Sequence, residues 1–286
     1  MSLRTSLMPL GAHLPTSKGF AAALIEAQKL NLDCLQIFSK SPRQWLAKPL
    51  DAQIAADFRD KWRESGLCPL VAHDSFLINL ASPDETLRAK SIAAMVDEIE
   101  RAEALGCDYL VTHCGAHLKS SVEDGLKALS ASLVECLEKT GDLSVKVALE
   151  ITAGQGTCLG APFSHIGEVF KSVNSPRLST CFDTCHAFAA GHDIISDLDG
   201  VLADFDAQIG LGNLGVMHLN DAKGVLGGHL DRHEHIGEGA IGPDAMRAIL
   251  HHPKLRHLPF ILETPDVETM IAKNVAAVRE LLGVRP

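Results

Sequence analysis

The segment 216–239 carries the densest group of residues that could bind a metal ion. His218 ends a short apolar run, and Asp231 and His233 follow in a glycine-rich loop. In an extended loop, side chains two residues apart point the same way, so Asp231 and His233 can reach one ion together. Imidazole and carboxylate groups are the ligands that zinc or manganese takes where no thiolate is offered. The segment therefore predicts part of a metal site.

Side chains of the same kind stand at or just beyond the ends of other short apolar runs. They are His13, His73, His113, Glu150, Asp183 with His186, and Glu263. Each alone has an ordinary explanation, such as a hydrogen-bonded core histidine or a helix-capping carboxylate. As a set, they would crowd like-charged carboxylates together unless cations neutralise them. Without His13, and together with the three residues of segment 216–239, the candidate ligands number nine. At about three to four ligands per ion, nine suit two or three metal ions.

Eight short runs of apolar and β-branched residues alternate with longer amphipathic patterns. Several runs are apolar on both faces, which is typical of buried parallel strands. We expect strands at 9–14, 34–39, 70–73, 109–113, 146–151, 178–183, 216–219 and 260–263. Eight strand–helix units predict an α/β fold, a single (β/α)8 TIM barrel over residues 1–286 with its active site at the C-terminal face of the strands. A doubly wound sheet is the alternative, but Gly11-Ala12-His13 is not the glycine-rich turn that usually follows its first strand.

Several helices have recognisable ends. Ser82-Pro83-Asp84-Glu85 predicts a capping box with Pro83 at the first helical position, in a helix that closes at Gly106. The amphipathic run 51–65 ends before a glycine, Gly242-Pro243 begins a helix that ends about His252, and 264–266 begins the last helix, which stops near Gly283.

Composition narrows the class of protein. The net charge of −10 argues against a non-specific nucleic-acid coat. No apolar run is long enough to span a membrane, and the first ten residues lack the apolar core of a secretion signal. The eight cysteines include no C-x-x-C pair, and Cys181 and Cys185 are too close along one extended run for a disulfide framework, so we expect a reduced, cytoplasmic protein. Cys114 and Cys185 neighbour candidate ligands, and we expect them to be small buried hydrophobic residues.

Five segments, in order along essentially the whole chain, resemble the signatures of the endonuclease IV family. They are HDSFLINL (73–80), TAGQG (152–156), FDTCHAFAAG (182–191), MHLNDAK (217–223) and DRH (231–233). Members of this family are abasic-site DNA repair enzymes with a TIM barrel and three zinc ions. The resemblance implies hydrolysis of the phosphodiester 5′ to an abasic site in double-stranded DNA, which leaves a 3′-hydroxyl and a 5′-deoxyribose phosphate, by a protein that is a monomer.

The resemblance also implies a ligand set for each zinc ion. The expected sets are His73 and His113 for the first ion, Asp183, His218 and Glu263 for the second, and His186, Asp231 and His233 for the third, with Glu150 bridging the first two. Glu150 and Glu263 are the expected catalytic carboxylates. A metal-bound hydroxide is the expected nucleophile, because a bound metal ion brings the pKa of water to about 7. These ligand types also tolerate manganese at one site.

DNA-binding residues are expected in the loops around the mouth of the barrel. The loop 40–45 resembles the family loop that enters the DNA at the lesion. Its Arg43, Gln44 and Trp45 can fill the gap left by a missing base and stack on its neighbours. The alternative for this loop is an ordinary proline-containing turn, with Trp45 packed on the second helix.

Several positions depart from the family pattern or match it loosely. Phe76 stands where some members carry tyrosine, so a stacking contact with DNA is kept and a hydroxyl contact is lost. His13 lies in a matching segment and is expected to touch the DNA or a metal ligand. Ile151 and Cys114 stand where relatives have asparagine and proline, and each flanks a candidate ligand without replacing one.

Two other functions remain open. Glu150, Asp183, His218 and Glu263 alone also resemble the metal core of the xylose-isomerase-like sugar isomerases and epimerases. Such an enzyme needs neither the loop 43–45 nor the five other candidate ligands, which are His73, His113, His186, Asp231 and His233. The other alternative is a protein that binds damaged DNA, or stores metal, without catalysis, and the complete ligand set argues against it.

Overall fold

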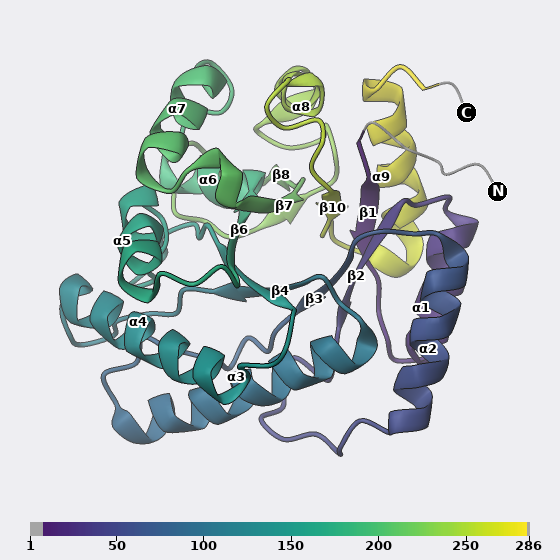
Figure 1. Cartoon of the computed structure of the whole chain (residues 1–286). Helices are drawn as coiled ribbons and strands as arrows, with labels where there is room; N and C mark the ends of the chain where they lie inside the picture. The colour runs from purple at the N-terminus through teal and green to yellow at the C-terminus, as the bar shows by residue number, and fades with distance from the viewer. Residues whose placement is uncertain (1–7, 285–286) are drawn as a thin grey trace.

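The computed structural model describes residues 8–284, and residues 1–7, which hold most of the segment judged to lack a secretion signal, lie outside that range. Eight parallel strands close into a barrel in the order β1-β10-β7-β6-β5-β4-β3-β2, and helices form an outer ring around it (Figure 1). The strands are β1 Leu10–His13, β2 Cys34–Phe38, β3 Leu70–His73, β4 Tyr109–His113, β5 Lys146–Glu150, β6 Leu178–Asp183, β7 Leu214–His218 and β10 Phe260–Leu262. The predicted TIM barrel is confirmed.

The helices follow the strands in alternation. They are α1 Phe20–Lys29, α2 Ala52–Ser65, α3 Glu85–Leu105, α4 Val122–Lys139, α5 Phe163–Val173, α6 Thr184–Ala190, α7 Leu198–Gln208, α8 Gly242–His251 and α9 Val267–Leu281, with a short 3-10 turn at Leu211–Asn213. A two-stranded antiparallel hairpin, β8 Asp221–Ala222 with β9 His233–Glu234, lies in the segment between β7 and α8. Within residues 8–284, no helix combines the length and the apolar character that a membrane crossing requires.

The helix limits at α3 correct one prediction. Asp84, and not Ser82, caps this helix, because its side chain accepts the hydrogen bond from the backbone N–H of Leu87 at 2.9 Å. Pro83 therefore precedes the cap instead of occupying the first helical position. Ser82 is buried, and its hydroxyl accepts from the N–H of Asp84 at 3.2 Å. The predicted end at Gly106 is confirmed, with a left-handed φ of 80°.

Strand β7 begins two residues before the predicted start at Val216. The sequence does not indicate this earlier start, because Gly215 has no preference for strand structure. A Cβ atom at Gly215 would lie 2.5 Å from both the Ser179 hydroxyl and a ring carbon of Tyr109. The close approach of neighbouring strands therefore explains the glycine.

A layer of small and apolar side chains fills the interior of the barrel below its mouth. Seven strands contribute one fully buried residue each: Cys34, Val71, Val111, Ala148, Cys181, Val216 and Ile261. Side chains two residues apart on a strand share a face. The residue two positions later on each strand therefore points into the barrel one level nearer the mouth.

Candidate metal centre

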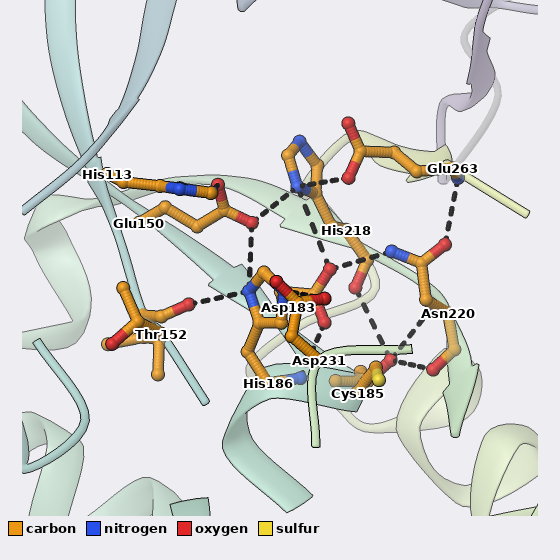
Figure 2. A network of polar contacts seen from close by, with 12 residues as sticks. His113, Glu150, Thr152, Asp183, Cys185, His186, His218, Asn220, Asp231 and Glu263 are labelled. Atoms are coloured by element: carbon orange, nitrogen blue, oxygen red, sulfur yellow. Dashed lines mark hydrogen bonds and ion pairs between the residues drawn. The ribbon is translucent and has the colours of Figure 1, made fainter. Parts of the chain in front are cut away.

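The level above this apolar layer is polar on every strand. Its residues are Gln36, His73, His113, Glu150, Asp183, His218 and Glu263, with His13 two residues after Gly11 on β1. Seven of the eight were predicted as site residues, and Gln36 on β2 was not. The barrel brings their side chains together at the C-terminal ends of the strands, where Figure 2 shows many of them converging.

The first candidate ligand group joins β3, β4 and β5. The nearest nitrogens of His73 and His113 lie 3.3 and 3.0 Å from Oε2 of Glu150, and the three side chains are placed as metal ligands could be. His73 donates from Nδ1 to the backbone carbonyl of Asp74 at 3.1 Å, which leaves Nε2 facing the carboxylate. The hydrogen bond fixes the ring tautomer that an ion at Nε2 requires.

The second group centres on the buried ring of His218. Its Nδ1 lies 3.0 Å from Glu150 Oε1, 3.1 Å from Glu263 Oε2 and 3.8 Å from Asp183 Oδ2. Potential ligand atoms of these four residues all lie within 4.8 Å of one another. Glu150 thus faces both the first and the second group, as a bridging carboxylate would.

The third group joins Asp183 to His186 and His233. Nε2 of His186 lies 3.2 Å from Oδ1 of Asp231, and Nε2 of His233 lies 3.6 Å from Asp183 and 3.9 Å from Asp231. His233 donates from Nδ1 to the carbonyl of Glu263 at 2.9 Å, whereas its Nε2 is buried and has no hydrogen-bond partner among the described residues. A buried nitrogen aimed at two carboxylates without a bond of its own is what a metal ligand needs.

Asp183 and His186 are held by the start of α6. Asp183 caps this helix, with Oδ1 accepting from the N–H of His186 at 2.8 Å. Its other oxygen accepts from the side-chain amide of Asn220 at 2.7 Å, and the carbonyl of the same amide accepts from the N–H of Glu263 at 2.8 Å (Figure 2). Asn220 therefore ties the ends of β6, β7 and β10 together beside the second group.

Asp221 organises the loop that carries Asp231 and His233. Its buried carboxylate accepts from backbone N–H groups of Ala222, Gly237, Gly239, Ile241 and Gly242, at 2.8 to 3.3 Å. These backbone donors satisfy both oxygens of the buried carboxylate. The Asp221 carboxylate holds the two ends of the segment between β7 and α8 together, and so fixes the hairpin from which His233 projects.

The charged groups of the site are compatible with bound cations. Burial alone would raise the pKa of Glu150, but His218, His113 and His186 hold it well below its ordinary value. Burial lowers the pKa of His186, but Asp183, Asp231 and Glu150 outweigh it, and the net pKa lies well above the ordinary value. Glu150 therefore carries its charge, and without an ion the imidazole of His186 holds a proton beside it. A divalent cation can replace that proton.

The cysteines near the site are buried thiols. Burial raises the pKa of Cys114, Cys181 and Cys185 to about 12 in each case. All eight cysteines are unpaired, and Cys185 lies in α6 and not on the extended run with Cys181. Cys181 is within ligand distance of Glu150 and His218, but it belongs to the apolar layer below them. The prediction that Cys114 and Cys185 are small buried residues is confirmed.

A cleft of about 410 Å³ opens above the candidate ligands. Its walls include His13, Phe76 and six ligand candidates, namely His73, His113, His186, Asp231, His233 and Glu263. Phe76 is 58% exposed and meets the edge of Phe38, with ring centroids 5.5 Å apart. The His13 ring is tilted by 53° against that of Phe38, with centroids 4.2 Å apart, and its Nδ1 lies 3.1 Å from Oε1 of Glu263. His13 therefore contacts a candidate ligand residue, and its contact with DNA stays a prediction.

Arg43, Gln44 and Trp45 lie in the β2–α2 loop and do not line the cleft. The Ser75 hydroxyl donates to the carbonyl of Pro42 at 2.8 Å, which places this loop beside the loop of Phe76. Arg43 and Gln44 are exposed, whereas the indole of Trp45 is partly buried and has the ammonium of Lys90 on α3 above its ring at 4.2 Å. The DNA contacts of these residues stay predictions.

A buried ion pair attaches the start of this loop to α3. The Lys40 ammonium lies 2.5 Å from Asp97 and 3.5 Å from Glu98, and Glu98 also accepts from the Ser39 hydroxyl. The side chains of Lys40 and Glu98 are only 2% and 1% exposed. Lys40 therefore neutralises the carboxylate of Glu98, which has little access to water.

Lys40→Met should lower the free energy of unfolding by about 3–5 kcal/mol, because it leaves Glu98 buried and uncompensated. Adding Glu98→Gln should restore much of the loss. Chemical denaturation measures both. Lys29→Met removes an exposed pair with Glu26 and should change stability by less than about 1 kcal/mol. A Lys40→Met protein as stable as the wild type would show that the pair is not needed to hold the loop.

Three comparisons identify the family. A family described as "Xylose isomerase-like TIM barrel" matches residues 24–282. A "Probable endonuclease 4" of Chloroflexus aggregans is 42% identical over 279 residues, which is 96% of this chain and 98% of that protein. A protein of the same name from Methanoculleus marisnigri is 42% identical and covers 96% and 99%. The chain belongs to the endonuclease IV family. The crystal structure of endonuclease IV from Thermus thermophilus superposes with a TM-score of 0.87 at 35% identity, covering 97% of this chain and 100% of that one.

As a member of the endonuclease IV family, the protein is a hydrolase of the nuclease class that acts in DNA repair. A D-tagatose 3-epimerase-like protein shares the barrel with a TM-score of 0.73, but at 21% identity this shows the fold alone. That match is therefore no evidence for sugar isomerisation, whereas the two relatives at 42% identity bear the name endonuclease 4.

Proposed function

We propose that this endonuclease hydrolyses the phosphodiester 5′ to abasic sites in double-stranded DNA, leaving a 3′-hydroxyl and a 5′-deoxyribose phosphate. The observation that carries the proposal is the set of three adjoining ligand groups below one open cleft, with Glu150 common to two groups and Asp183 common to two. Such an arrangement suits a charged, two-oxygen substrate group such as a phosphodiester better than a neutral sugar.

The residues present fit three zinc ions. His73 and His113 with Glu150 would hold the first, Glu150, Asp183, His218 and Glu263 the second, and Asp183, His186, Asp231 and His233 the third. The unpartnered Nε2 of His233 supports this fit. When bound, such ions activate water at neutral pH and offset the charge that develops on the phosphate and the leaving oxygen. Manganese in one of the positions is compatible with the ligand types.

The side chains of the protein itself have a positioning role in this proposal. Glu150 and Glu263 keep their charge and hold the ligand groups together, and Phe76 and His13 line the cleft where the lesion would enter. The single tyrosine, Tyr109, begins β4 at the opposite end of the barrel, so no tyrosine serves as a proton donor at the mouth. Arg43, Gln44 and Trp45 would contact the DNA around the missing base.

A nicking assay tests the proposed function. The purified protein is incubated with a duplex that carries one tetrahydrofuran abasic-site analogue, with and without a chelator, and with an undamaged duplex of the same sequence. We expect one cut immediately 5′ to the lesion, lost with chelator and recovered on adding zinc. Binding without a cut would support a non-catalytic DNA binder, and neither binding nor cutting would return the sugar-isomerase alternative, which an epimerisation assay then decides.

Arg43→Ala should weaken binding to the abasic duplex roughly tenfold, because the guanidinium is exposed beside the Phe76 loop and free to reach the DNA. Metal content should not change. Fluorescence anisotropy with a labelled duplex measures the affinity. Arg63→Ala is the matched control, since Arg63 is an exposed residue of α2 that pairs with Asp60. Loss of metal in Arg43→Ala would instead place this residue in support of the ligand groups.

We also infer a monomer that works in the cytoplasm. Eight unpaired cysteines support a reducing compartment. Sedimentation analysis of the purified chain tests the monomer.

A further inference from the structure

Gln36 completes the polar ring of the barrel from β2, where it is fully buried between apolar neighbours. Its amide oxygen lies 2.8 Å from Nε2 of His218, and its amide nitrogen lies 2.6 Å from Oε1 of Glu263. We propose that Gln36 is a positioning residue of the metal centre, which turns Nδ1 of His218 and Oε2 of Glu263 toward the second metal ion. The proposal rests on the metal centre of the proposed function and not on the identity of the DNA lesion.

The direction of the amide is decided by its neighbours. The nitrogen donates to Glu263 and also lies 2.9 Å from Nδ1 of His13. The opposite orientation would place the carbonyl oxygen 2.6 Å from a carboxylate oxygen, and two acceptors repel at this distance. The carbonyl oxygen of Gln36 therefore faces His218. Because this oxygen can only accept, the proton of the neutral His218 ring is on Nε2 and the lone pair is on Nδ1.

The other histidines of the centre show why His218 needs such a partner. His73, His186 and His233 each direct Nδ1 to a backbone carbonyl, at 3.1, 2.9 and 2.9 Å, and so present Nε2 to the site. His218 is reversed, since its Nδ1 is the atom that faces Glu150 and Glu263. The Gln36 side chain supplies the acceptor that backbone carbonyls supply elsewhere. Partners of this kind set the ring orientation and the basicity of a metal-binding histidine.

The Gln36 amide also determines which carboxylate oxygen of Glu263 remains available to bind a metal ion. Oε1 accepts from Gln36 and lies 3.1 Å from Nδ1 of His13, whereas Oε2 lies 3.1 Å from Nδ1 of His218. One carboxylate oxygen is therefore anchored in the protein and the other is left beside the ligand atom of His218. Gln36 holds two of the four ligands of the second group with one side chain.

Zinc titration in competition with a chromogenic chelator tests the proposal on Gln36→Met, which keeps the size of the side chain and removes both hydrogen bonds. One zinc-binding step should weaken by about 10- to 100-fold, while the remaining steps stay within about twofold. Cys34→Ala is the matched control, because Cys34 lies on the same strand and the same face one level deeper. It should leave every zinc-binding step unchanged even if it lowers the melting temperature.

A second measurement uses the unaltered protein. Long-range ¹H–¹⁵N spectra of the zinc-loaded wild type should show His218 protonated on Nε2 and zinc-bound through Nδ1. Zinc on Nε2 of His218, or a Gln36→Met protein that binds every zinc ion with wild-type affinity, would overturn the proposal. A protein that binds zinc as expected but does not cut the abasic duplex would contradict the proposed function and leave the role of Gln36 intact.

Discussion

Glu263→Gln should lower the rate of nicking by about 10³-fold, while binding of the abasic duplex stays within about threefold of the wild type. Glutamine keeps the shape of the side chain but removes its charge. Oε2 of Glu263 lies 3.1 Å from Nδ1 of His218, within the second ligand group. Burial alone would raise the pKa of Glu263, but His218 and His13 hold it well below the ordinary value, so a full negative charge is lost at neutral pH.

Binding is expected to survive because the charge is lost below the surface that meets DNA. Only 15% of the Glu263 side chain is exposed, and of the residues predicted to contact DNA, Arg43, Gln44, Trp45 and Phe76 lie in the loops after β2 and β3. Single-turnover nicking and anisotropy on the same preparation separate the two effects. Glu234→Gln is the control, because Glu234 is a partly exposed carboxylate of β9 that faces Lys223 at 3.7 Å and belongs to no ligand group. A Glu263→Gln protein that cuts at the wild-type rate would refute the ligand assignment.

The barrel was predictable because each strand is a short apolar run in the sequence. The candidate ligands were predictable because ionisable residues stand at the ends of these runs. An ionisable residue such as Glu150 or His218 at the end of a buried strand has few ordinary roles. The sequence alone therefore predicts that the set binds cations. Gln36 was missed since a neutral amide carries no such signal. Its one mark is that it interrupts four apolar residues, CL-Q-IF, and a buried polar residue within a strand must have partners.

Other features depend on contacts that arise only in the folded chain. The clamp on Asp221 uses N–H groups from residues 237–242, whose approach depends on the path of the whole loop. Helix α6 has only seven residues, too few for a helical pattern to be recognised in the sequence, which instead suggests one extended run through Cys185. At α3 both Ser82 and Asp84 can cap a helix, and only the folded chain shows that Asp84 is the cap while Ser82 is buried and bonded to the N–H of Asp84.

Asp183→Asn should remove two of the three metal ions, because this carboxylate faces both the second and the third ligand groups. Asp183 is fully buried, and Oδ2 lies 3.8 Å from Nδ1 of His218 and 3.6 Å from Nε2 of His233. A neutral amide at this position leaves the imidazoles of both groups without the charge that a shared ligand supplies. Elemental analysis of protein purified without chelator should give about three zinc ions for the wild type and about one for the variant.

The variant should still fold, because asparagine caps helices nearly as well as aspartate. The backbone N–H of His186 can still donate to the side-chain oxygen at residue 183, now an amide, so α6 keeps its first turn. Asp197→Asn is the matched control, since Asp197 caps α7 through the N–H of Gly200 and has no part in the ligand groups. If Asp183→Asn retained three zinc ions, the two groups would not share this carboxylate. If it lost all three while Asp197→Asn lost none, the ions would bind as one cooperative cluster anchored on Asp183.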